Sequence, residues 1–80
     1  MSRYFLHLKD STDEVLYPEG TEMPAELVPA AALRSARDCI AGDAKNGTID
    51  LHYRIEVVNE SGELVHTLHF SDAVEVVPPR

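Results

Sequence analysis

Four histidines in a chain of 80 residues are the side chains best suited to chemistry. Strand-like alternation places His7, His52 and His69 on one face of a predicted sheet, with Glu56 on the same side. Imidazoles with a nearby carboxylate are ligands that zinc accepts. However, no two of the four histidines have the spacing of a dedicated site, such as two histidines four residues apart on a helix. We therefore expect no bound metal, and a metal or small-ligand site of His7, His52 and His69 is the alternative hypothesis.

The other reactive side chains fit structural roles. Ser71 and Asp72 follow an apolar run, where Ser-Asp usually forms a turn or a helix cap. Cys39 lies among alanines without a C-x-x-C partner, as a small apolar core residue does. The sequence contains neither a phosphate-binding glycine pattern nor a G-x-S-x-G nucleophile elbow. We therefore expect no catalytic residue, no cofactor and no enzymatic activity.

Two hairpins and one helix would position these residues. Apolar alternation between polar turn clusters predicts strands over about 3–9, 14–17, 49–58 and 63–70, with a short final strand over 74–77 as an option. Leu33, Ala36 and Ile40 lie at helical spacing and predict a helix over about 25–45, with Pro29 near its start and Gly47 after its end. The predicted fold class is α+β with ββαββ order: a four-stranded antiparallel sheet carrying one amphipathic helix on one face. The first strand is expected beside one of the last two.

Length, charge and cysteine content limit the classes of protein. The 80 residues form a single predicted domain, 1–80. Seven basic and fourteen acidic residues give a net charge of −7, and the basic residues are scattered, so we expect neither nucleic acid nor an anionic membrane as partner. One cysteine, no signal-like N-terminus and no run of about 20 apolar residues favour the cytoplasm.

Four short blocks resemble the landmarks of one protein family. They are Arg3-Tyr4-Phe5-Leu6-His7-Leu8, Ala32-Leu33-Arg34-Ser35-Ala36, Arg54-Ile55-Glu56-Val57 and Phe70-Ser71-Asp72-Ala73-Val74. Together they are similar to a family of short alphaproteobacterial, rhizobial-type proteins classed as a domain of unknown function, with an RYFFHL-like start and an FSDAV-like end. The sequence departs from the family pattern at Pro29 and His69. The resemblance implies a bacterial cytoplasmic protein of this fold, and it implies no catalytic residues.

The sheet face that one helix leaves uncovered is the expected functional surface. A helix of roughly twenty residues covers one side of such a sheet. Mixed aromatic, aliphatic and polar residues on the other side are typical of a protein interface. The expected interaction surface consists of Phe5, His7, Tyr17, Arg54, Val58 and Val65. We therefore expect a non-catalytic interaction module that self-associates, as a homodimer, or binds another protein through its open sheet face or sheet edge.

Overall fold

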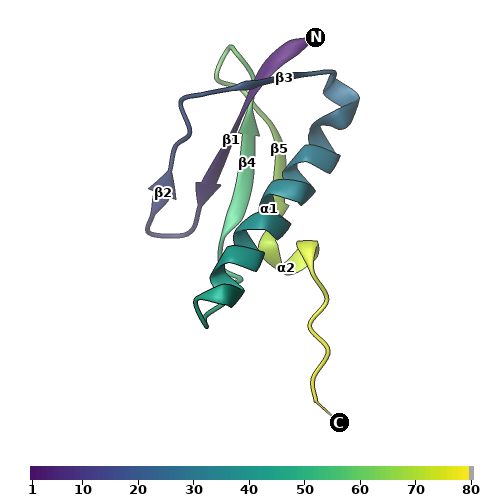
Figure 1. Cartoon of the computed structure of the whole chain (residues 1–80). Coiled ribbons are helices and arrows are strands. Elements are labelled where there is room, and N and C mark those ends of the chain that lie inside the picture. The colour runs from purple at the N-terminus through teal and green to yellow at the C-terminus, as the bar shows by residue number, and fades with distance from the viewer. Residues whose placement is uncertain (80) are drawn as a thin grey trace.

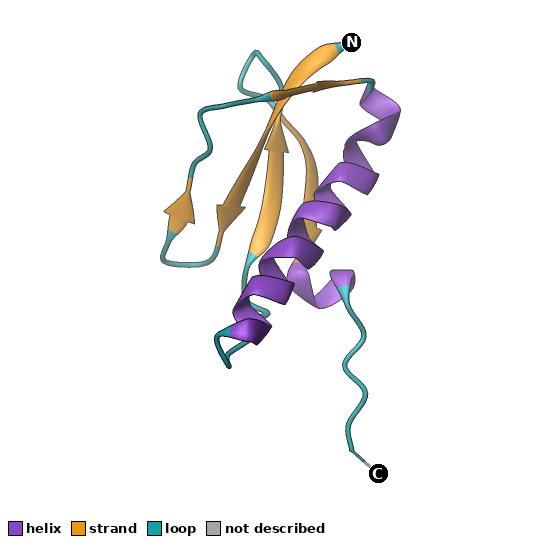
Figure 2. Ribbon diagram, in the orientation of Figure 1, coloured by secondary structure: helices purple, strands orange, loops and turns teal. Residues whose placement is uncertain are grey.

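The computed structural model describes residues 1–79 as an antiparallel sheet of five strands with one long helix across one face (Figures 1 and 2). The strands are β1 (Ser2–Lys9), β2 (Glu14–Val15), β3 (Thr21–Met23), β4 (Arg54–Val58) and β5 (Leu64–His69). The helical elements are a 3-10 turn (Ala25–Leu27), α1 (Val28–Lys45) and the single turn α2 (Phe70–Ala73). The α+β class and the antiparallel sheet are confirmed. The four-strand ββαββ order is wrong, because β3 and α2 are additional elements.

The strand order is β2-β1-β4-β5, and β3 also pairs with β1. β1 pairs with β4 on one side, which confirms the expected contact between the first strand and one of the last two. On its other side β1 pairs with two short strands in turn, since β3 lies opposite Ser2–Tyr4 and β2 lies opposite Leu8 and Lys9. Among the described residues, the middle of β1 therefore has no strand partner along this edge.

The long helix begins and ends where its proline and glycine residues predict. Pro24 precedes the 3-10 turn, and Pro29 lies in the first turn of α1, where its missing N–H leaves no carbonyl unpaired. Lys45 ends the helix, and Gly47 follows in the left-handed region with φ +90°. The predicted helix over about 25–45 is confirmed as the 3-10 turn followed by α1.

The core lies between α1 and the sheet. Val28, Ala32, Ala36 and Ile40 form the buried face of α1, and the small side chains of Ala32 and Ala36 let the helix lie close to the strands. The largest fully buried side chains are Phe70, Ile55 and Val57. Val57 and Ile55 come from β4, which lies between β1 and β5 in the sheet, and α1 packs against both β4 and β5.

A single turn of helix closes the C-terminal end of the sheet. The Phe70 N–H donates to the Tyr53 carbonyl at 3.0 Å, and the Arg37 Nε donates to the Ala73 carbonyl at 2.8 Å. Beyond α2 the chain runs away from the domain (Figure 1), where Val76 and Val77 are 70% and 71% exposed. The optional strand over 74–77 is therefore wrong, because these residues pair with no strand within the described part of the chain.

Three predicted strands are shorter than expected, each for a local reason. β2 ends at Val15 rather than at 17, because the Tyr17 N–H donates to a side chain on β1 and Pro18 has no N–H to donate. β4 begins at Arg54 rather than at 49, because the Asp50 carboxylate accepts the His52 N–H at 2.9 Å and forms a turn. β5 ends at His69, where the chain enters α2.

Candidate functional site

The sheet face away from α1, called the open face from here on, is organised in rows across three strands. Since the core-facing residues of β1 and β4 alternate with outward-facing ones, the register defines each row. The rows are Phe5–Val58–Leu64, His7–Glu56–Thr67 and Lys9–Arg54–His69. The first row is apolar and the last is cationic or imidazole-bearing, so the two ends of the open face differ in chemistry.

Glu56 is the centre of a network of ion pairs at the polar end. Its carboxylate lies 3.0 Å from Lys9 Nζ and 2.7 Å from Arg54 Nε, and Lys9 also reaches Glu14 at 3.5 Å. The hydrogen bonds from Arg54 and then from Lys9 hold the pKa of Glu56 below its ordinary value. The bond to Glu56 in turn raises the pKa of Lys9. The acidic and basic side chains at this end of the open face therefore neutralise one another, and no partner is needed to neutralise them.

The apolar end of the open face continues onto the edge of the sheet. Phe5 and Val58 are opposite each other on β1 and β4, and Leu64 lies opposite Val58 on β5. The register between β4 and β5 shifts at Val57/Val58, which makes Val65 an extra residue. Leu64 and Val65 are 56% and 46% exposed. Alternation along β5 assigns Leu64 to the buried face. Its place on the open face follows from the bulge, and the bulge has no clear signal in the sequence.

The histidines of the alternative hypothesis do not come together. His52 lies in the turn before β4, with a side chain 92% exposed, and its Nδ1 is 3.0 Å from Asp50 Oδ1. His7 and His69 do lie on the open face, but on β1 and β5, with β4 between them and in neighbouring rows rather than the same row. Within residues 1–79, no three His, Cys, Asp or Glu side chains lie close enough to hold a metal ion.

His7 has a structural partner. Its Nδ1 accepts a hydrogen bond from the Tyr17 N–H at 3.0 Å, and its ring stacks on Phe5 with centroids 6.4 Å apart. The Tyr17 side chain itself lies elsewhere than expected, because it lines a hollow on the helix side of the sheet. Of the six expected surface residues, the structure therefore places Phe5, His7, Arg54 and Val58 on the open face, Val65 at the β5 bulge, and Tyr17 away from both.

Cys39 is a half-buried residue packed against the core from α1. Burial raises the pKa of its thiol, and the charges of Asp43 and Asp38 raise it further. The thiol is therefore protonated at neutral pH and behaves as an apolar side chain.

The outer edge of β5 is the second surface of interest. β5 is the last strand of the sheet, so one side of its backbone has no strand partner among the described residues. Its six residues, Leu-Val-His-Thr-Leu-His, include no proline and no Lys, Arg, Asp or Glu. Native proteins usually protect such edges with charges, prolines or very short strands. Of the features that protect a strand edge, β5 has only its bulge.

These features define a small α+β domain. Its open face has an ion-paired polar end and an apolar end, and the apolar end adjoins a strand edge, β5, that carries no charge and no proline. The chain belongs to the domain of unknown function DUF6894, whose family model matches residues 3–71. This range contains the first three resemblance blocks and the start of the fourth. No curated protein and no solved structure matches the chain. No helix in the described residues is both long and apolar enough to cross a membrane.

Proposed function

We propose that this protein is a non-catalytic interaction module, and that two copies associate by pairing their β5 strands edge to edge. The observation that carries the proposal is the uncharged, proline-free outer edge of β5, with Leu64 and Val65 exposed beside it. Antiparallel pairing of two identical strands is self-complementary, so it forms a closed dimer about a two-fold axis. Addition of a strand to a free edge is a recurring mode of protein recognition.

The two edges of the sheet support the choice of β5. The opposite edge is divided between β2 and β3, which are two and three residues long. It carries Glu14 and Glu22, and both are paired with basic residues of β1. Short, charged strands resist the addition of another strand. β5 is six residues long and carries no such protection.

The apolar row of the open face extends the proposed interface. Phe5, Val58 and Leu64 lead directly to Val65 at the start of β5. A second copy that pairs with β5 would therefore cover apolar area as well as satisfy backbone groups. The ion pairs around Glu56 lie at the other end of the face, so pairing leaves them undisturbed.

The register shows which backbone groups face the free side. The Phe70 N–H donates to the carbonyl of Tyr53, the residue directly before β4. Alternate residues before Phe70, Leu68 and His66, therefore also direct their N–H groups toward β4. Thr67 and His69 therefore direct their N–H groups outward. Thr67 lies in the middle of the edge, where a proline would remove one outward donor and leave the bonds to β4 intact.

Light scattering on a size-exclusion peak tests the proposal with a matched pair of variants. We expect the wild-type mass at high concentration to be twice 8.9 kDa. Thr67→Ala, which keeps the N–H, remains a dimer, whereas Thr67→Pro is a monomer with an unchanged circular dichroism spectrum. Hydrogen exchange of the wild type is a second readout that needs no variant. We expect the Thr67 amide to exchange more slowly at high than at low protein concentration. A wild-type chain that stays monomeric with a freely exchanging Thr67 amide would refute pairing through β5.

We also propose a cytoplasmic, bacterial setting for this module. A single cysteine suits a reducing compartment, and Cys39 is an apolar core neighbour rather than half of a disulfide. The family resemblance supports a bacterial origin. Fractionation of cells that express a tagged full chain tests the location, and recovery with the envelope would contradict it.

A further inference from the structure

A hollow on the helix side of the sheet is separate from the β5 edge. It has a volume of about 530 Å³, and its floor is formed by Tyr4 and Leu6 of β1 with Ile55 of β4. One wall is the connection from β2 to β3, including Tyr17 and Pro18. The other wall is α1, through residues that include Cys39. A mostly apolar hollow of this size is within the range of small-molecule sites.

Local sequence explains why the hollow exists. The chain from Leu16 to Gly20 leaves β1 between the β2 and β3 pairings, so on this side of β1 no strand of residues 1–79 fills the space. Small residues, Ser35 and Cys39, face the hollow from α1 and leave room above the strands. Figure 2 shows the helix crossing over β4 and β5, with the β2 side of the sheet beside it.

Two side chains of β1 hold the outer wall in place. His7 Nδ1 accepts the Tyr17 N–H at 3.0 Å, and Arg3 Nη1 donates to the Gly20 carbonyl at 2.9 Å. Gly20 has no Cβ, which permits the close approach, since a Cβ there would lie 2.8 Å from Arg3 Cδ. The wall is therefore fixed before any ligand arrives, which lowers the entropy lost on binding.

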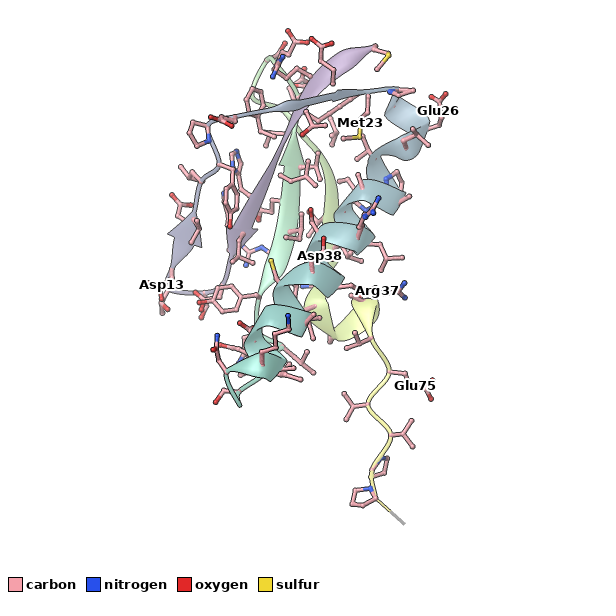
Figure 3. All side chains as sticks on the ribbon, viewed as in Figure 1. Asp13, Met23, Glu26, Arg37, Asp38 and Glu75 are labelled. Atoms are coloured by element: carbon pink, nitrogen blue, oxygen red, sulfur yellow. The ribbon has the colours of Figure 1, made fainter. Side chains whose placement is uncertain are left out.

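The charged groups that line the hollow are both acidic. Glu19 lies on the outer wall and Asp38 on α1, and neither forms an ion pair with a basic residue in the described chain. Two nearby arginines are engaged elsewhere, because Arg3 bonds Gly20 and Glu22, while Arg37 bonds Ala73. Arg34 lies four residues before Asp38 on α1 and forms no ion pair among the described residues. Figure 3 shows Asp38 on α1 and Arg37 on the same helix beside α2.

We propose that this hollow binds a small organic cation, an amine with an apolar body. The apolar floor would accept the hydrocarbon part, the rings of Tyr4 and Tyr17 offer aromatic faces, and Glu19 and Asp38 attract the positive end. The exposed segment Glu75–Val77 of another copy is a poorer occupant, because its only charge is the carboxylate of Glu75. Charge complementarity therefore selects a cation.

Three probes that share one hydrocarbon chain test the proposal. Hexylammonium, hexan-1-ol and hexanoate are titrated into the full chain, with amide chemical shifts from two-dimensional NMR and calorimetry as readouts. We expect hexylammonium to shift amide signals of residues around Tyr17 and Cys39, the alcohol to bind more weakly, and hexanoate not to bind. This comparison uses only the wild-type protein, so it does not depend on the folding of any variant.

Charge-neutralising variants locate the site. Because Glu19 and Asp38 are exposed, Glu19→Gln and Asp38→Asn should fold, and each should weaken hexylammonium binding about threefold. Asp72→Asn removes the same charge from α2, outside the hollow, and is expected to leave the affinity unchanged. Four results would each overturn the proposal. They are the absence of hexylammonium binding, equal affinity for hexylammonium and hexanoate, amide shifts confined to another surface, and an affinity that neither Asp38→Asn nor Glu19→Gln changes.

Discussion

The hydrogen bond from the Tyr17 N–H to His7 is one of the two contacts through which side chains of β1 hold the wall of the hollow. His7→Phe keeps an aromatic ring beside Phe5 and removes the acceptor. A neutral hydrogen bond contributes about 1 kcal/mol. Since Tyr17 is exposed, water replaces His7 once the wall opens, so the free energy of global unfolding should fall by less than about 1 kcal/mol. The larger effect is local opening of residues 16–20.

Hydrogen exchange at the Tyr17 amide measures that local opening. Loss of about 1 kcal/mol corresponds to roughly fivefold faster exchange. His7→Asn is the matched control, because an amide oxygen can occupy the position of Nδ1 and restore the bond. The Asp10 amide, which donates to the Asp13 carbonyl at 2.8 Å in the same hairpin, serves as an internal reference and should not change. Two results would refute this role of His7. In the first, the Tyr17 amide exchanges equally fast in the wild type and in His7→Phe; in the second, its exchange is accelerated equally in His7→Phe and His7→Asn.

Four further substitutions test the core, the ion pairs, the loop and the long helix. Phe70→Ala should lower the free energy of unfolding by about 3–5 kcal/mol, because the ring is 1% exposed, and urea denaturation measures the loss. Glu56→Gln should cost about 1 kcal/mol at pH 7. Because folding lowers the pKa of Glu56, the wild type loses this stability as the pH falls below about 4.5. The difference in unfolding free energy between the wild type and Glu56→Gln therefore shrinks in acid. An equal difference in denaturation experiments at pH 7 and pH 3 would contradict this. Gly20→Ala should cost about 1–2 kcal/mol by displacing Arg3. Gly42→Ala, a helical position with open space around it, should instead stabilise by about 0.5–1 kcal/mol, and thermal melts that ranked the two variants the other way would contradict this expectation.

The predictable part of the candidate surface is the part that depends on strand alternation. Phe5, His7, Arg54 and Val58 lie on the open face as alternation within β1 and β4 predicts. His52 and Tyr17 do not, since each lies just beyond the end of a strand that local side-chain hydrogen bonds shorten. Alternation predicts the other face for Leu64, because a single extra residue in β5 changes the alternation.

The sequence by itself determined the α+β class, the bounds of the long helix and the presence of two hairpin regions. These follow from local physics: the spacing of Leu33, Ala36 and Ile40, the proline at the helix start, and the glycine at positive φ after its end. Only the tertiary structure decided that the chain between β2 and β3 departs from β1 and encloses a hollow. That departure depends on His7 and Arg3, side chains on the opposite face of the sheet and far from the loop in sequence. Contacts between residues 10 to 17 positions apart leave no periodic signal, so only the folded chain shows them.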